Sequence, residues 1–452
     1  MNPKISIIVT SYNIESFIGE CLNNIVNQTI KDIEIIVVDD GSTDKTQDII
    51  NEYAAKDSRI IPILNTQNSP GGVATPANIG IDMAKGDFIG FADGDDLYDV
   101  SMFEKLYNSA LKNNADIALC NFQEFESESG VKNEPYEPSW SKVALNDSLD
   151  ISNPDNKKII LELLPVPWRK IYNRKMLSSK SLHFPVGPFF FEDNGFHWMT
   201  TLNSNKVAFV NEVLCLHRRN RVGQTMSSGG ERLLGVFHQH SVIYEYLSEE
   251  NILNDYREYA LNWLCGHVSW IQQVLASSYA KEFYDALIPH FSKYTKSEVQ
   301  DYFLNRFYDR KSIELIIAVI SKDQKKFVKV MNGALSEKMN EKVKFNYHKL
   351  GLRRFTSMSI RHLKYKICSY RHKIAGRKYI SSQANVSLEI SEKLDLVLDK
   401  IHEVNSRLDH IEVSQNKLFM DIHHGFHKNE HNIKNLEKIV ETGFILSERN
   451  LK

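Results

Sequence analysis

A cluster of carboxylates, Asp93-Gly94-Asp95-Asp96, follows directly on the apolar run Phe88 to Ala92. Carboxylate oxygens are the ligands that Mg²⁺ and Mn²⁺ prefer, and Mg²⁺ takes its remaining ligands from water and substrate phosphates. Acids at the exposed end of a buried strand therefore favour a metal site that receives a nucleotide-activated substrate. Because Asp and Gly also favour turns, the cluster by itself is equally typical of an acidic loop.

The elements before this cluster show how it would be positioned. The runs Ile5 to Val9 and Ile33 to Val38 are rich in β-branched residues, which is typical of parallel strands buried on both faces. After each of these runs comes a segment with the apolar spacing of a helix, Ile14 to Thr29 after the first and Asp44 to Lys56 after the second. In such α/β sheets the ligand crevice lies beyond the carboxyl ends of the strands. We expect three polar strand ends to meet in that crevice: Thr10 to Asn13, Asp39 to Ser42 and Asp93 to Asp96.

These ordered segments, over roughly the first half of the chain, resemble the family 2 inverting glycosyltransferases of the GT-A fold. The resemblance implies an α/β fold, with a Rossmann-like nucleotide-binding GT-A domain over residues 1–230. One departure is Ala77, because many relatives have Arg at this place immediately before the Asn. The missing cation leaves the identity of the donor open. The similar segments are Ser6 to Asn13, Val38 to Asp44, Gly71 to Gly86, Asp93 to Asp96 and Phe191 to Asn194.

Two side chains in these segments suit a nucleoside. The Asp39 carboxylate can accept the imide N–H of a base such as uracil, and the Tyr12 ring can stack on that base. The resemblance implies the same roles. Tyr12 is also typical of an interface aromatic, and Asp40 of a turn or helix cap. The residues predicted to bind the nucleotide-sugar donor are Thr10, Tyr12, Asn13, Asp39, Asp93 and Arg219.

Asp93 and Asp95 match the Asp-x-Asp pair of the family. The resemblance implies that the second acid contacts the metal and the first contacts the ribose or the metal shell. His217 is a further candidate ligand, so Asp95, Asp93 and His217 are predicted to hold Mn²⁺ or Mg²⁺. Asp96 is alternatively a helix cap for the residues from Leu97 onwards.

An inverting transfer also needs a base that takes the proton of the acceptor hydroxyl. Glu192 and Asp193 follow the aromatic run Phe189 to Phe191, where partial desolvation would raise the pKa of a carboxylate. By resemblance to the family's Glu-Asp motif, Asp193 is the predicted catalytic base, and Glu192 orients it or holds the acceptor. The alternative is that the pair caps the helix that begins near Asn194.

Two further segments are predicted to support the site. Trp168 offers a flat face for an acceptor sugar and Lys170 a cationic hydrogen-bond donor, although Trp168 is equally typical of a core residue. The run His217 to Arg221 contains arginines that match phosphate oxygens, and it precedes a Gly- and Ser-rich loop, Val222 to Gly230, with the composition of a lid. Such a charge run is also typical of a solvated edge.

Length and composition bound the remaining organisation. The chain has 452 residues, of which 42% are apolar, so more than one domain is expected. Its five cysteines show no paired spacing, which fits a reducing cytosol. Because Met1 to Lys4 leads straight into a strand and no apolar run reaches the ~20 residues of a membrane span, we expect a cytoplasmic protein, peripheral on the cytoplasmic face of the membrane.

The second half of the chain changes character. Residues 231–340 have helical spacing, including Val299 to Ala334, and we expect aromatic residues such as Trp263 and Trp270 to serve packing. Residues 341–380 hold twelve Lys or Arg against one acid, with apolar residues at near-helical spacing, which predicts a basic amphipathic segment apposed to an anionic membrane. Packing on an acidic surface is the alternative. Residues 388–446 show heptad spacing, which predicts a coiled coil that joins copies of the chain or docks another protein.

Together these features predict a metal-dependent inverting glycosyltransferase. It would transfer a sugar from a UDP-linked donor to a glycan acceptor. A lipid-linked glycan of the bacterial surface would suit the basic segment. We expect no nucleic-acid partner, since no reading module is recognisable. Two alternatives remain: a catalytically degenerate coiled-coil scaffold for glycan assembly, and a sugar nucleotidyltransferase, which lacks support because residues 11–19 do not form a basic phosphate loop.

Overall fold

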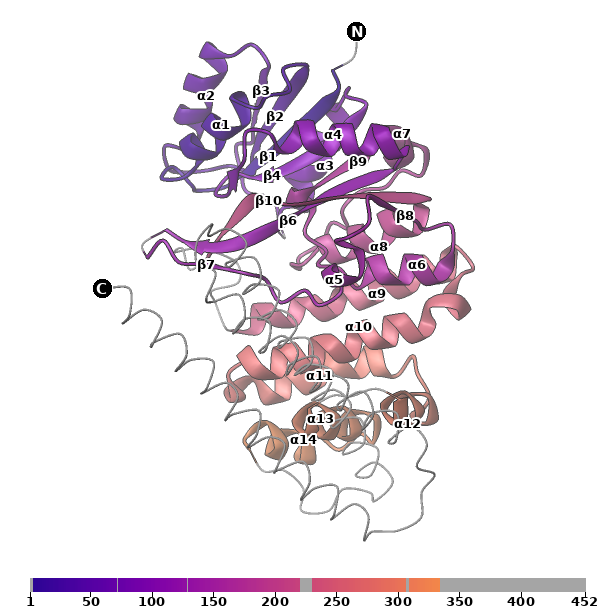
Figure 1. Cartoon of the computed structure of the whole chain (residues 1–452). Coiled ribbons are helices and arrows are strands. Elements are labelled where there is room, and N and C mark those ends of the chain that lie inside the picture. Colours follow the sequence, from indigo (N-terminus) through magenta and orange to yellow (C-terminus); the bar gives the residue numbers. More distant parts are fainter. Residues whose placement is uncertain (1–2, 71, 128, 220–229, 306–308, 334–452) are drawn as a thin grey trace, which may run out of the picture. The chain divides into compact units, whose positions relative to one another are not determined.

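A computed structural model describes residues 3–70, 72–127, 129–219, 230–305 and 309–333 (Figure 1). Several predictions fall outside these residues: the basic segment 341–380, the coiled coil 388–446, residues 222–229 of the expected lid and the last part of the expected helical region, 334–340. Within the part that the structure describes, no helix is long and apolar enough to cross a bilayer.

The parallel part of the sheet consists of β1, β2 and β4, which the sequence predicted as strands, and of β3, which it did not predict. β1 pairs with β2 and β4, and β2 pairs with β3, in each case in parallel. Every residue of β1 and β2 is buried, which explains why both strands are continuous apolar runs and not alternating ones. The bounds are Ile5–Ser11 for β1, Ile33–Asp39 for β2, Ile60–Leu64 for β3 and Phe88–Asp93 for β4.

The other half of the sheet is mixed. The order is β3-β2-β1-β4-β9-β6-β10-β5, with β9 antiparallel to both β4 and β6, and β10 parallel to β6. The register of β10 against β6 shifts near Val213, where the strand bulges before its last residues. The bounds are Leu97–Tyr98 for β5, Ile117–Glu126 for β6, Lys132–Asn133 for β7, Ser148–Asp150 for β8, Lys170–Asn173 for β9 and Lys206–Arg219 for β10.

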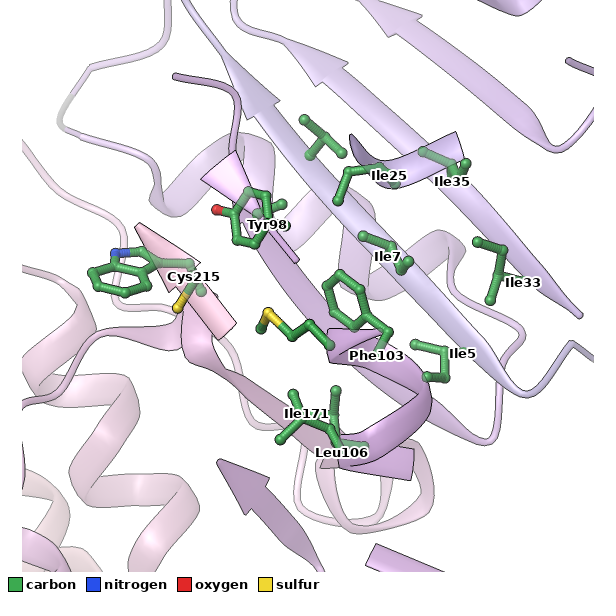
Figure 2. Close-up of a cluster of buried hydrophobic side chains, with 14 of the residues drawn as sticks. Ile5, Ile7, Ile25, Ile33, Ile35, Tyr98, Phe103, Leu106, Ile171 and Cys215 are labelled. Atoms are coloured by element: carbon green, nitrogen blue, oxygen red, sulfur yellow. The ribbon is translucent and has the colours of Figure 1, made fainter. Parts of the chain in front are cut away.

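Helices cover both faces of this sheet. Ile5, Ile7 and Val9 of β1 pack into a core with α1, α2 and α4, part of which Figure 2 shows, whereas Ile8 packs into a second core with α3, α6 and α8. The alternation follows from the two-residue period of a strand. The bounds are Ile18–Val26 for α1, Thr46–Lys56 for α2, Ala74–Met83 for α3, Met102–Asn113 for α4, Trp140–Val143 for α5, Pro154–Leu161 for α6, Arg174–Ser179 for α7 and Asp193–Asn203 for α8, with a 3₁₀ turn η1 at Pro167–Arg169.

Residues 230–305 and 309–333 are helical, as predicted, and these described residues contain no strand. α9 packs against both α8 and α10, so the helices continue from the sheet domain (Figure 1). The expected pattern from Val299 divides at Asp309 and Asp323, whose side chains cap the next helices. The bounds are Val236–Glu249 for α9, Leu253–Val274 for α10, Ala280–Phe291 for α11, Lys296–Asn305 for α12, Arg310–Ile320 for α13 and Gln324–Met331 for α14, with 3₁₀ turns η3 at Glu231–Gly235 and η4 at Ser277–Tyr279.

Candidate active site

The strand register brings the predicted polar ends together. Thr10 at the end of β1 lies beside Asp93 at the end of β4, and Ser11 lies beside Asp39 at the end of β2. Thr10 is 8% exposed, so its side chain lies largely within this edge. The carboxyl ends of three neighbouring parallel strands therefore form one polar edge of the sheet, as the strand pattern predicted.

Asp39 is fully buried and its carboxylate accepts four hydrogen bonds from the chain itself. The donors are Ser42 N at 2.8 Å, Ser42 Oγ at 2.5 Å, Ser11 Oγ at 2.9 Å and Gln47 Nε2 at 2.7 Å. An N–H of a nucleoside base would have to replace one of them. The two hydroxyl groups are the ones that can rotate away, so Ser42 and Ser11 belong to the predicted base pocket, although the sequence did not single them out.

The loop after β1 is held against the turn after β2. Asn13 adopts a left-handed backbone with φ of 49°, its N–H donates to Ser42 Oγ at 2.8 Å, and its Oδ1 accepts from Thr43 N at 2.8 Å. Tyr12, next to it, is 44% exposed, so its ring is open to a stacking partner. The interface alternative for Tyr12 is not seen among the described residues.

Asp40 organises the following loop. Its carboxylate accepts from Asn68 Nδ2 at 3.1 Å and from Ser69 Oγ at 2.7 Å, which is the turn role that the sequence left open. Gly41 is required at this place because its φ is 79° and a Cβ would lie 2.4 Å from the Gln67 carbonyl carbon. Asp40 thus builds the wall of the crevice.

The acidic cluster concentrates negative charge at the end of β4. Burial raises the pKa of Asp93 well above its usual value, and Asp96, Asp95 and, more weakly, Asp193 raise it further. Burial also raises the pKa of Asp96. Carboxylates that repel one another in this way are stabilised by a cation placed among them.

Asp96 does not cap a helix, because α4 begins only at Met102. It accepts instead from His217 Nδ1 at 2.9 Å and from Arg218 N at 2.8 Å, both on β10. Burial would lower the pKa of His217, but Asp96, together with Asp93 and Asp95, raises it to about 9. A carboxylate on Nδ1 orients the imidazole so that Nε2 is the nitrogen left for a metal.

These side chains fit a divalent metal in chemical type. Asp93 and Asp95 supply hard oxygens, and His217 supplies a ring nitrogen oriented by Asp96, which are ligands that Mn²⁺ accepts. In the described residues no three such groups are already gathered closely enough to hold an ion. The ligand set Asp95, Asp93 and His217 therefore stays a prediction.

Arg218, which the sequence named only as part of the run His217 to Arg221, holds the acidic loop in place. Its guanidinium donates to the Asp95 carbonyl at 2.7 Å and to Glu20 at 2.9 Å, and it lies over the Phe17 and Phe125 rings. Arg218 thus fixes the loop that carries the metal candidates. The period of a strand could have found it, because His217 and Arg219 lie on one face of β10 and Arg218 on the other. Arg219 is partly exposed, with Glu124 Oε1 at 3.3 Å, and its donor role stays a prediction.

Asp193 is the first residue of α8. Burial raises the pKa of Asp193, and this outweighs Lys170 and the hydrogen bonds of Asn194, which lower it. The direction is the one predicted from the aromatic run before it, and it strengthens the carboxylate as a base. The charge of Asp193 reaches Asp93, which places the predicted base and the predicted metal site within one electrostatic neighbourhood.

Glu192 has a different partner from the one expected. It is 4% exposed, its Oε1 accepts from Ala74 N at 3.0 Å, and its side chain makes no cap hydrogen bond to α8. Burial raises the pKa of Glu192 to about 7, against backbone hydrogen bonds from Val73 and Ala74 that lower it. Glu192 therefore joins α8 to the start of α3, and its contact with the acceptor stays a prediction.

Trp168 and Lys170, whose contacts with the acceptor also stay predictions, are buried, and for Trp168 this is the core position that the sequence left open. The Trp168 ring is 4% exposed, since His217 stacks on it at 5.0 Å and Phe122 meets it edge-on at 4.7 Å. Lys170 is 2% exposed, and its Nζ donates to the carbonyls of Leu164 and Pro165. Both residues contact or act on predicted site residues. The Trp168 ring stacks on the imidazole of His217, and the charge of Lys170 lowers the pKa of Asp193.

Asn78, which follows the missing arginine, forms a structural bridge. Its Nδ2 donates to Phe184 O and its Oδ1 accepts from Phe184 N, both at 2.8 Å. This amide joins α3 to the segment before α8. Ala77 is 1% exposed within the core between α3 and the sheet, so a long cation at position 77 would have no room.

Comparison with known proteins places this geometry in context. A profile of the family described as Glycosyl transferase family 2 matches residues 6–179. The glycosyltransferase GlyG of Streptococcus pneumoniae is 31% identical over 231 residues, which are 50% of this chain and 74% of GlyG. The uncharacterized glycosyltransferase EpsJ of Bacillus subtilis is 33% identical over 222 residues, which are 49% of this chain but less than two thirds, 62%, of EpsJ.

A third relative has been solved with a ligand. TarS of Staphylococcus aureus, a poly(ribitol-phosphate) beta-N-acetylglucosaminyltransferase, is 29% identical over 227 residues, or 50% of this chain and 37% of TarS. The crystal structure of TarS 1–349 in complex with UDP-GlcNAc matches with a TM-score of 0.52 at 20% identity, over 73% of this chain and 90% of that one. At this identity the likeness concerns the fold, and it supports a GT-A-like α/β domain at the N-terminus.

Proposed function

The chain belongs to glycosyltransferase family 2, and from this we propose that it is a metal-dependent inverting enzyme that moves a sugar from a UDP-linked donor to a bacterial surface glycan. One observation carries the proposal: the register of β1, β2 and β4 gathers Thr10, Asp39 and Asp93 at one edge of the sheet, and Asp193 at the start of α8 is among the charges that raise the pKa of Asp93. An inverting transfer needs this pairing, with the leaving diphosphate and the attacking hydroxyl on opposite sides of the anomeric carbon.

The donor would lie along the polar edge formed by β1, β2 and β4. Tyr12 would stack on the base, Asp39 would accept its N–H, and Thr10, Asn13 and Asp93 would line the path to the diphosphate. Asp95, Asp93 and His217 would hold Mn²⁺ or Mg²⁺, which when bound offsets the charge of the leaving diphosphate. Arg219 would add a cation on the same side.

On the opposite side, Asp193 performs the proton transfer. The oxygen of the acceptor hydroxyl attacks the anomeric carbon, the bond from that carbon to the diphosphate oxygen breaks, and its electron pair leaves with the nucleoside diphosphate. Asp193 takes the hydroxyl proton. Burial raises its pKa, which makes it a better base than an exposed aspartate.

The acceptor is a glycan or a similar hydroxyl-rich polymer. The relatives include an enzyme named for poly(ribitol phosphate), a hydroxyl-bearing polymer, and this supports the class of acceptor. We further propose that the acceptor is lipid-linked, because the twelve cations of residues 341–380 would draw the enzyme to an anionic leaflet. The heptads of residues 388–446 would join copies of the chain or a coiled-coil partner.

Nucleotide release tests the catalytic part of the proposal. The full chain is incubated with UDP-glucose, UDP-galactose, UDP-N-acetylglucosamine and GDP-mannose in the presence of Mn²⁺, and the freed nucleotide is measured. We expect release from a UDP-sugar, lost in Asp95→Ala and kept in Asp255→Ala, a first-turn aspartate of α10. Silence with every donor would overturn the proposal and favour the scaffold alternative.

Vesicle flotation tests the membrane part separately. The full chain is compared with a variant that carries Lys364→Gln, Lys366→Gln, Arg371→Gln and Lys373→Gln. We expect the wild type to float with vesicles that contain anionic lipid and the variant to float less. Equal flotation of the two proteins would remove the basic segment as an anchor and leave the transferase activity untouched.

A further inference from the structure

Helix α10 reaches the predicted catalytic base through a short chain of hydrogen bonds. The Trp263 indole N–H donates to Asn194 Oδ1 at 3.2 Å, and the Asn194 amide donates in turn to Asp193 Oδ1 at 2.9 Å. Trp263 and Asn194 are 69 positions apart in the sequence. The helical region therefore contributes a side chain, Trp263, that is linked to Asp193 through the single intervening side chain of Asn194.

Two more aromatic side chains follow on the same face of α10. His267, one turn after Trp263, has its ring 3.8 Å from the Trp263 ring, centroid to centroid, at an angle of 30°. Trp270, a further turn along, meets the Phe191 ring edge-on at 5.9 Å. Positions 263, 267 and 270 have the four- and three-residue spacing of one helix face.

These side chains differ from the tryptophans of the core. Trp140, Trp168 and Trp198 are each less than one tenth exposed, whereas Trp263, His267 and Trp270 are only half-buried. The sequence alone favoured a packing role for this face. Trp263 and Trp270 are partly exposed, and they contact Asn194 and Phe191, the residues that flank Glu192 and Asp193.

The hydrogen-bonding groups of this helix face follow from the tautomer of His267. His267 Nδ1 lies 2.8 Å from the Trp263 carbonyl, which can only accept, so the proton is on Nδ1. Burial, against this hydrogen bond, lowers the pKa of His267 to about 4, so the ring is neutral and Nε2 is a hydrogen-bond acceptor. The face thus has two indole rings, one acceptor nitrogen and no charge.

We propose that Trp263, His267 and Trp270 form a binding subsite for the acceptor sugar, with the pyranose ring against the indoles and one of its hydroxyls donating to His267 Nε2. Aromatic rings suit the C–H faces of a pyranose, and the absence of a cation selects a neutral sugar and not a phosphate. This subsite deepens the proposed function and rests on it, since it orients the acceptor whose hydroxyl Asp193 deprotonates.

The five tryptophans allow a test that does not require the natural acceptor. The full chain is labelled with 5-fluorotryptophan, and the five ¹⁹F resonances are assigned by single Trp→Phe variants at positions 140, 168, 198, 263 and 270. Methyl β-glycosides of glucose, galactose and N-acetylglucosamine are then titrated in the presence of UDP and Mg²⁺. Sorbitol, which has hydroxyls but no ring, is the control ligand.

We expect a glycoside to shift the resonances of Trp263 and Trp270, while those of Trp140 and Trp198 stay in place and sorbitol has no effect. Trp270→Leu should weaken glycoside binding about tenfold, as loss of an aromatic contact does. The matched control is Tyr259→Leu, two turns or more from Trp270 on α10, which should bind as the wild type does. Shifts at Trp263 and Trp270 no larger than at Trp140 would overturn the subsite.

The same spectra separate this failure from failure of the proposed function. UDP with Mg²⁺ should shift Trp168, which lies under His217 at the donor edge. A Trp168 shift together with nucleotide release, but without a glycoside effect at Trp263 and Trp270, would remove only the subsite. No Trp168 shift and no nucleotide release would remove the proposed function itself.

Discussion

We call the carboxyl ends of β1, β2 and β4, with Asp39 and Asp93, the donor edge, and the start of α8, with Glu192 and Asp193, the acceptor wall. These two regions are built in different ways. At the donor edge the contacts are made between neighbouring strand and helix units: Ser11 and Asp39 are 28 positions apart, and Asn13 and Ser42 are 29. At the acceptor wall, Glu192 bonds to Ala74 across 118 positions. The part of the donor edge around Asp39 is therefore built from neighbouring strand and helix units, whereas the acceptor wall joins distant segments, as does the contact of Asp96 with His217 across 121 positions.

The two sides also differ in charge. The donor edge holds three neighbouring acids, balanced by His217 and Arg218 on β10. Asp193 on the acceptor wall is surrounded by Asn194 and, further away, by buried Lys170. A crowded acidic edge suits a metal and a diphosphate, while a single partly desolvated carboxylate suits proton transfer.

The sharpest test of this difference removes the predicted catalytic base of the acceptor wall, Asp193, and leaves its neighbour Glu192 in place. Asp193→Asn keeps the size of the side chain but cannot take a proton, so sugar transfer should fall by about 10²–10⁴-fold. Binding of UDP, measured by calorimetry, should stay at the wild-type level because the donor edge is intact. Asp155→Asn, an exposed first-turn aspartate of α6, is the matched control and should transfer normally. A similar loss of UDP binding would show that the two sides are not separable.

The next largest effect concerns stability and the joint between α8 and α3. Because burial raises the pKa of Glu192 from 4.5 to about 7, the folded chain binds this proton more tightly than the unfolded chain does. The free energy of unfolding should therefore be highest below pH 4.5 and fall as the pH rises toward 7. At 1.36 kcal/mol per pKa unit, the loss amounts to about 3 kcal/mol.

Glu192→Gln keeps an oxygen for Ala74 N and removes the titration, so its unfolding free energy should change less between pH 5 and pH 7. Urea unfolding at several pH values measures this, with Glu212→Gln, which is exposed, as the control. Parallel pH slopes in wild type and Glu192→Gln would contradict the buried, α3-bound position of this acid.

The same contrast explains what the sequence could predict. The donor edge could be predicted from the sequence because β-branched runs such as Ile33 to Val38 end directly in polar residues, and parallel strands bring such ends together. The predicted parallel pairing of β1 and β2 and the helical character after residue 230 are confirmed. Motifs in the same segments carried the family resemblance.

The contacts of the acceptor wall could not be predicted from the sequence in this way. Nothing near Glu192 in the sequence indicates Ala74 as its partner, and nothing near Asn194 indicates Trp263. Trp168 looked suited to a sugar because its type fits, but an aromatic residue in a short 3₁₀ turn has no period that tells a buried ring from an exposed one. Contacts between distant segments decide these roles.

A smaller effect is expected at the donor edge when one predicted metal ligand is removed. Asp95→Asn keeps the size of the side chain and leaves the backbone carbonyl to which Arg218 donates. We expect transfer to fall on the order of 100-fold, and the remaining activity to respond little to EDTA, whereas wild-type activity should be lost with EDTA and return with Mn²⁺. Wild-type transfer that persists unchanged in EDTA would contradict the metal site, while the acceptor wall would keep its role.

The smallest expected effect is a change in the pH dependence of transfer. The Asn194 side chain donates to Asp193 Oδ1 and so lowers the pKa of Asp193, in opposition to burial, which raises it. Asn194→Ala removes this hydrogen bond, so the pKa of Asp193 should rise and the acid limb of kcat/KM should move to higher pH. Trp263→Phe, which loses the N–H that orients the Asn194 amide, should move the limb in the same direction but less far. Tyr259→Phe, on the same helix, should leave the profile in place, and identical profiles for all four proteins would mean that α10 does not act on the base.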